Sequence, residues 1–189
     1  MKVRVISQSI IVAALFCLSA PVFAAPTWKI IPADSSLTFT ATQNNAPITG
    51  SFKKFTGNIQ FDPADLKSSR VEIDVDIASV TAGDSQVADT LKTKDWFNVT
   101  VFPHAVFKAT DFVKTGDKKY EAKGVLTIRA KTIPMVLVFN LDDYAANKAH
   151  ATGSTTLQRT QFGVGQGDWS KTDAIKDDVR VDFIISATK

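Results

Sequence analysis

The side chains that could do chemistry in this chain are few and widely separated. His104 and His150 lie in different segments, and neither has a cysteine or an HExxH-type spacing around it. A catalytic metal site is therefore not favoured, although two histidines and a carboxylate from across a sheet could still form one. We interpret both as exposed or edge histidines. No GxSxG motif is present, and the single cysteine, Cys17, lies in a predicted leader that is removed from the mature protein. We therefore predict no catalytic residue and no enzyme.

A second candidate is the glycine-rich stretch FGVGQGDW at 162–169, with Gly163, Gly165 and Gly167. It superficially resembles a dinucleotide-binding GxG motif. Such a motif needs a preceding parallel strand and a following helix, and nothing in the sequence suggests a βαβ unit. We interpret the stretch as a flexible loop, with Trp169 folding over the sheet.

Arg159 is the third candidate, because it ends a segment whose other odd positions are small or apolar. If that parity holds, Arg159 points inward near a rim, where it would meet a polar ligand head group or pair with Asp168 as a structural clamp. An enzyme acting on an apolar substrate would use Arg159 with Asp168 or His104, but no pair at general acid–base spacing supports that alternative. The small or apolar positions before it are Ala149, Ala151, Gly153, Thr155 and Leu157.

Strand patterns dominate the rest of the chain, and the clearest covers 68–79. Apolar and acidic side chains alternate there, which is typical of a strand with one buried and one wet face. The apolar set is Val71, Ile73, Val75 and Ile77, and the acidic set is Glu72, Asp74 and Asp76.

Seven further segments carry strand patterns, which makes eight strands in all. In one of them the apolar parity changes between Phe52 and Phe55, and a bulge near Lys53 and Lys54 would restore a single inward face. The closing strand contains Phe183. The seven segments are 35–42, 49–62, 105–112, 119–130, 133–141, 148–160 and 179–185.

The segment 84–97 differs from its surroundings and predicts a short helix. Asp84 or Ser85 can cap it, and Trp96 and Phe97 follow as an apolar plug. We therefore predict an all-β fold, either an eight-stranded antiparallel up-and-down barrel or a sandwich, with a short helical insertion between strands 3 and 4 that would cover one end of a barrel. A barrel of this size either holds one slender ligand or is filled by its own side chains.

The N-terminus has the layout of a signal peptide. Lys2 and Arg4 precede an uncharged apolar run, and the small residues Val22 and Ala24 follow at the spacing of a cleavage site after Ala24. We predict that 1–24 is a cleaved leader, that 25–189 is one barrel domain, and that the protein is periplasmic. The mature chain would hold no cysteine and hence no disulfide. Its charges nearly balance, so a nucleic-acid partner is not indicated.

Five stretches carry a family resemblance, in the family's own order along the chain. They are GSFKKFTGNIQFDP at 50–63, SSRVEIDVDIASV at 68–80, DTLKTKDWFNVTVFPHAVF at 89–107, KGVLTIRAKT at 123–132 and RTQFGVGQGDW at 159–169. The sequence resembles the YceI-like family of periplasmic, polyisoprenoid-binding, lipocalin-like proteins. The resemblance implies an eight-stranded antiparallel lipocalin-like β-barrel whose hydrophobic tunnel holds a long isoprenoid chain. Family members often carry a histidine in the first strand, where this chain has Ser35, Ser36 and Leu37.

We therefore predict a carrier that holds a long-chain isoprenoid lipid, of the quinone or polyprenyl type, without a cofactor. The alternatives are a packed structural or stress-response barrel and the enzyme described above. A homodimer and, from the resemblance, a membrane-bound b-type cytochrome are the protein partners that this interpretation allows. The predicted ligand-binding residues are Phe39, Phe52, Phe55, Ile73, Val75, Leu91, Trp96, Phe97, Leu126, Ile128, Phe139, Arg159 and Phe183.

Overall fold

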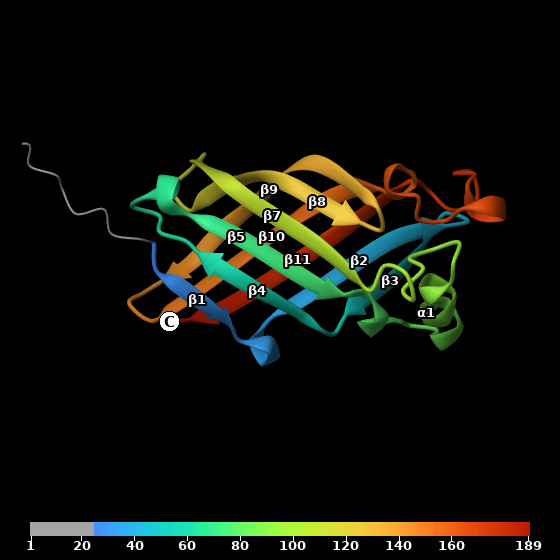
Figure 1. Ribbon diagram of the computed structural model, residues 1–189, viewed down its shortest axis with the longest axis horizontal. Helices are drawn as coiled ribbons and strands as arrows, with labels where there is room; N and C mark the ends of the chain where they lie inside the picture. Colours follow the sequence, from blue (N-terminus) through green and yellow to red (C-terminus); the bar gives the residue numbers. More distant parts are fainter. Residues whose placement is uncertain (1–24) are drawn as a thin grey trace, which may run out of the picture.

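The computed structural model describes residues 25–189, which form an elongated barrel of antiparallel strands (Figure 1). One α-helix and five short 3-10 helices complete the structure, and none of the helices in this range is long and apolar enough to span a membrane. The strands are β1 (Thr27–Ile30), β2 (Ser36–Gln43), β3 (Ala46–Phe52), β4 (Phe55–Gln60), β5 (Arg70–Asp76), β6 (Val80–Ala82), β7 (His104–Lys114), β8 (Lys119–Ile128), β9 (Lys131–Tyr144), β10 (Lys148–Gln158) and β11 (Asp178–Thr188). The helices are η1 (Pro32–Asp34), η2 (Leu66–Ser68), η3 (Ile77–Ser79), α1 (Ser85–Lys92), η4 (Arg159–Phe162) and η5 (Gly167–Trp169).

These eleven segments build eight barrel strands, because three of the strands are interrupted. β1 and β2 both pair with β11, and η1 separates them. β3 continues into β4, and β5 continues through η3 into β6. The pairs Lys29↔Thr188 and Ile30↔Ala187 close the ring. The predicted eight-stranded antiparallel barrel is confirmed, and so is the helical insertion between its third and fourth strands.

The predicted irregularity at Lys53 and Lys54 separates β3 from β4. The neighbouring barrel strand is interrupted at the same level, where η3 lies between β5 and β6. Ser79 links the two breaks: its carbonyl accepts from Lys53 N (3.3 Å) and its hydroxyl accepts from Lys54 N (3.0 Å). As a result Phe52 and Phe55 both face the interior, which confirms the change of parity.

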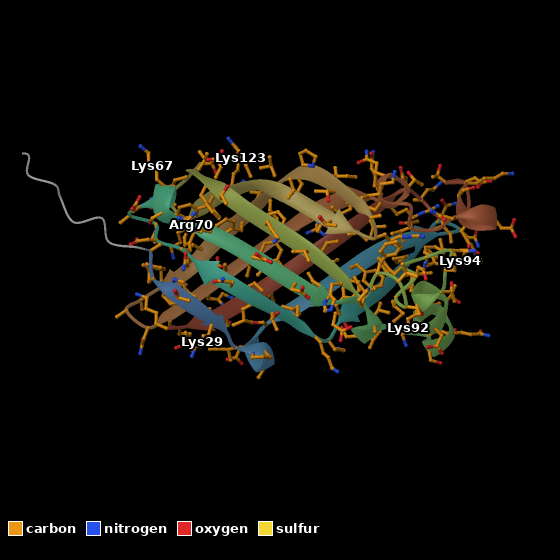
Figure 2. The ribbon with its side chains drawn as sticks, viewed as in Figure 1. Lys29, Lys67, Arg70, Lys92, Lys94 and Lys123 are labelled. Carbon is orange, nitrogen blue, oxygen red and sulfur yellow. The ribbon has the colours of Figure 1, made fainter. Side chains whose placement is uncertain are left out.

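The alternation predicted for 68–79 is also confirmed. The apolar side chains of β5 face the interior, whereas Glu72 and Asp74 lie on the outer face and pair with residues of β7. Asp76 instead caps η3, since its carboxylate accepts from Ala78 N at 3.0 Å. Glu72 lies 3.1 Å from Lys108 Nζ, and Asp74 lies 2.6 Å from His104 Nδ1. Figure 2 shows further charged side chains, such as Lys123, directed away from the barrel wall. The charged residues of the wall therefore surround an apolar interior.

The strand β1 was absent from the sequence prediction. It contributes Trp28, which is 2% exposed and whose indole nitrogen donates to the Phe61 carbonyl at 3.0 Å. Trp28 and Phe61 belong to a buried cluster with Phe112, Tyr120 and Leu141. This cluster lies toward the barrel end that holds β1 and the C-terminus, opposite α1 (Figure 1).

Candidate functional site

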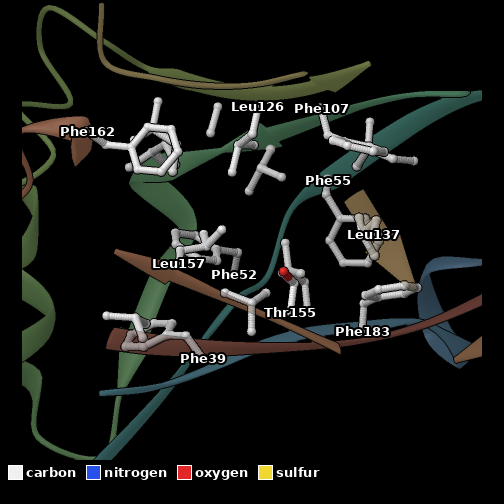
Figure 3. Close-up of a pocket in the computed structure, with 18 of the residues that line it drawn as sticks. Phe39, Phe52, Phe55, Phe107, Leu126, Leu137, Thr155, Leu157, Phe162 and Phe183 are labelled. Carbon is white, nitrogen blue, oxygen red and sulfur yellow. The ribbon is translucent and has the colours of Figure 1, made fainter. Parts of the chain in front are cut away.

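The barrel encloses an apolar cavity of about 560 Å³ (Figure 3). This volume lies within the range of roughly 300–1,000 Å³ that is typical of small-molecule sites. All thirteen residues predicted to bind a ligand line it, from Phe39 on β2 to Phe183 on β11. The structure therefore brings these residues together around one cavity. Their role in ligand binding stays a prediction.

The interior is not filled by its own side chains. Phe52, Phe55, Leu126 and Phe183 line the cavity, yet each keeps part of its surface accessible. In a core packed to the usual density of ~0.74, inward-facing side chains of this size would be fully covered. Their accessible surface is cavity surface, which disagrees with the alternative of a packed barrel.

Several lining residues were missed by the sequence prediction. Phe107 and Leu137 lie on the inward faces of β7 and β9, and the parity of the predicted strands at 105–112 and 133–141 could have identified them. Phe162 carried no such signal, because it lies in η4, beyond the last regular strand position. It packs with Trp96 and Val164 in a buried cluster near α1.

Two glycines shape the cavity wall by leaving room for phenylalanine rings. A Cβ atom at Gly50 would overlap the Phe39 ring and the Thr81 carbonyl. One at Gly153 would overlap the Phe183 ring and lie 2.6 Å from the Val138 carbonyl oxygen. Each ring therefore rests over the backbone of a neighbouring strand, instead of projecting further into the cavity.

Gly153→Ala is expected to lower the free energy of unfolding by about 1–3 kcal/mol, the usual cost of overpacking. Phe183 can swing into the cavity, but the Val138 carbonyl belongs to the β9–β10 ladder and cannot move freely. Urea denaturation measures the loss. Gly83→Ala is the matched control, because nothing lies within 4 Å of a Cβ at Gly83. Equal stability of the two variants would contradict this description of the wall.

The cavity opens near α1. Its exposed lining residues are Asp84, Gln86 and Trp169, and all three lie at this end of the barrel. Asp84 caps the helix as predicted, since its carboxylate accepts from Gln86 N at 2.8 Å. Val87 on the same helix lines the cavity. The helix therefore forms one side of the mouth, whereas the sequence predicted that the insertion covers this end.

Arg159 is buried, with 4% of its surface exposed, and its guanidinium lies over the Trp96 ring at 5.8 Å and donates its hydrogen bonds to backbone carbonyls. Burial lowers the pKa of Arg159, and the nearby Asp177 opposes that shift. The predicted clamp with Asp168 is wrong, because the loop turns its backbone oxygens toward the guanidinium instead. The acceptors are the carbonyls of Val164 (3.0 Å), Gly165 (3.4 Å), Lys171 (2.9 Å), Ile175 (2.8 Å) and Lys176 (3.1 Å).

The loop that supplies these carbonyls is shaped by its glycines. Gly163, Gly165 and Gly167 all have positive φ angles, and a Cβ at Gly165 would collide with the Arg159 guanidinium. The sequence suggested that Trp169 folds over the sheet, and the structure places it elsewhere. It packs on Trp96 with a ring-centroid distance of 5.7 Å, so the loop and the segment after α1 meet at the mouth.

The remaining polar candidates lie outside the cavity. The His104 side chain is 54% exposed and bonds Asp74, as predicted for an exposed histidine. His150 is partly buried on β10, which has neighbours on both sides, and its Nδ1 lies 2.9 Å from Ser186 Oγ, so it is not an edge residue. In residues 25–189 no three His, Cys, Asp or Glu side chains gather where a metal could bind. The catalytic set of Arg159 with Asp168 or His104 is not assembled.

The sequence model of the family described as the YceI-like domain matches residues 28–187 of this chain. The chain belongs to the YceI-like family. In solved structures, BcnA of Burkholderia cenocepacia is similar, with 31% identity and a TM-score of 0.80, over 84% of this chain and 99% of BcnA. A polyisoprenoid-binding domain from Saccharophagus degradans shares the fold, with 12% identity and a TM-score of 0.70, over 85% of this chain and 97% of that domain.

Proteins named UPF0312 are also similar to this YceI-like chain. One from Pseudomonas putida is 31% identical over 131 residues, which is 66% of this chain and 68% of the relative. One from Vibrio cholerae is 30% identical over 122 residues, which is 62% of this chain and 65% of the relative. The matched region thus spans about two thirds of these relatives.

In this YceI-like barrel, the serine at the start of the first predicted strand has a structural role. Ser35 Oγ accepts from Ser186 N at 3.0 Å and lies 3.3 Å from the Ser186 carbonyl oxygen. It therefore ties the end of η1 to β11, between the stretches where β1 and β2 pair with that strand.

Proposed function

We propose that the protein is a periplasmic carrier that holds one long-chain isoprenoid lipid, of the quinone or polyprenyl type, inside its barrel. The observation that carries the proposal is the apolar cavity of about 560 Å³ with its mouth beside α1. The fold shared with a polyisoprenoid-binding domain supports it. The predicted leader, which would direct the protein to the periplasm, lies outside the described residues.

The physical basis of binding follows from the ligand. An isoprenoid tail has almost no hydrogen-bonding groups, so its affinity comes from apolar surface removed from water, at ~25 cal/mol per Å². Burying ~400 Å² of such a tail would yield ~10 kcal/mol before the costs of ordering are subtracted. The phenylalanine-rich wall supplies the matching apolar surface.

A carrier role requires that the ligand enter and leave. The mouth is bordered by α1 and by the loop that Arg159 holds together, so a tail would enter beside Asp84 and Trp169 and extend toward the Trp28 cluster. The apolar ligand would then lie along the barrel axis, with the closed end setting the longest tail that fits.

The test is to purify the protein without detergent, extract it with organic solvent, and identify bound lipids by mass spectrometry. One isoprenoid lipid per protein is the expected result. Stripped protein should regain thermal stability when geranylgeraniol is added, because a ligand that binds only the folded state stabilises it. An empty extract, together with a melting temperature indifferent to added isoprenoids, would refute the carrier.

A further inference from the structure

A single hydroxyl group interrupts the apolar middle of the cavity wall. Thr155 lies on the inward face of β10, two residues after Gly153, and lines the cavity with Leu157 and Phe183 (Figure 3). The residue is partly accessible although it faces inward, so its accessible surface belongs to the cavity. A ligand passing along the barrel would contact this side chain.

Within residues 25–189 the Thr155 hydroxyl has no hydrogen-bond partner. The other lining threonine, Thr90, differs, because its hydroxyl donates to the Gln86 carbonyl at 2.8 Å. The Arg159 guanidinium is likewise fully bound by carbonyls. Since an unpaired hydroxyl in apolar surroundings is unfavourable, a partner supplied by a ligand would be strongly preferred there.

The strand pairing changes at Thr155. β10 pairs with β11 along its whole length, but with β9 only from Ala149 to Ser154. Thr155 is thus the first residue of β10 beyond the last pair with β9, Ser154↔Val138. The cavity-lining hydroxyl therefore lies where the pairing between β9 and β10 ends.

We propose that Thr155 selects ligands by bonding an oxygen atom of the bound lipid, an inference that rests on the proposed carrier function. The hydroxyl both donates and accepts, so a carbonyl or hydroxyl oxygen on the ligand satisfies it. The barrel therefore prefers isoprenoids that carry such an oxygen over hydrocarbon isoprenoids, and it draws that oxygen into the cavity.

The experiment compares the stripped wild-type protein with Thr155→Val and Thr155→Ser. Valine keeps the branched shape and removes the hydroxyl, whereas serine keeps the hydroxyl. Each protein is titrated with geranylgeraniol, an isoprenoid alcohol, and with squalene, a hydrocarbon, while tryptophan fluorescence is followed. Melting temperatures of the ligand-free proteins are measured in parallel.

Thr155→Val should weaken geranylgeraniol binding by about five- to tenfold, the effect of one hydrogen bond, and leave squalene binding unchanged or tighter. Thr155→Ser should stay within about twofold of wild type for both. The ligand-free valine variant should melt at or above the wild-type temperature, since an unpaired hydroxyl is removed.

Equal losses for both ligands would assign Thr155 a merely structural role, and no loss for either would also overturn the proposal. If the wild-type protein binds squalene but not geranylgeraniol, the proposed role of Thr155 in ligand selection is wrong, while the proposed carrier function is retained. If it binds neither, the carrier function itself fails, and the selection fails with it.

Discussion

Replacing Arg159 with methionine is expected to lower the free energy of unfolding by about 3–5 kcal/mol, because buried carbonyls that lose their donor cost roughly 1–3 kcal/mol each. The substitution leaves five carbonyls without a donor, among them those of Ile175 and Lys171. These carbonyls come from the loop beside the mouth, so the loop should lose its fixed conformation as well.

Urea denaturation of Arg159→Met measures this loss. Arg180→Met serves as the control, because Arg180 lies on the outer face, is 59% exposed and pairs with Asp182. Its midpoint should stay close to that of the wild type. Arg159→Lys should be intermediate, since three donors on one nitrogen cannot reach five separated carbonyls. Similar midpoints for the two methionine variants would refute the structural role of Arg159.

Leu126→Trp is expected to weaken isoprenoid binding about 100-fold or more. Leu126 packs against both the Trp28 cluster and the Trp96 cluster, so an indole there would fill the middle of the cavity. Excluding ~110 Å² of ligand contact would cost ~2.7 kcal/mol, which corresponds to about 100-fold in affinity. The fold should survive, because the ring occupies existing space.

Titration of the stripped variant with geranylgeraniol, followed by native mass spectrometry, measures this effect. Lys123→Trp is the matched control, since Lys123 lies on the same strand but points outward (Figure 2). It should bind like the wild type and melt at the same temperature. Undiminished binding by Leu126→Trp would place the ligand somewhere other than the cavity.

The barrel itself could be predicted from the sequence because its wall has two sides of different chemistry. The alternation along β5 and the change of parity at Lys53 and Lys54 both follow from the rule that neighbouring residues of a strand face opposite sides. The same rule predicted which residues face the interior, including Phe39 and Phe183.

Other features depend on distant partners, which no local pattern records. β1 is only four residues long, and its pairing with β4 and β11 makes it a strand. The acceptors of Arg159 are backbone oxygens, so the identity of residues such as Val164 and Lys176 gave no indication of them. Whether inward rings meet or leave a cavity depends on the barrel's width, which the order of residues does not state.

The closing pairs of the ring have a consequence for how the chain folds. Lys29 and Ile30 pair with Thr188 and Ala187, residues more than 150 positions away. Contacts of such long sequence separation are slow to form, because a long loop must close before they contribute. The β1 segment therefore cannot pair with β11 until β11 has been synthesised. Until then the growing sheet exposes two unpaired edges. Refolding should end with this step, and a chaperone that shields one edge would protect the nascent barrel from aggregation.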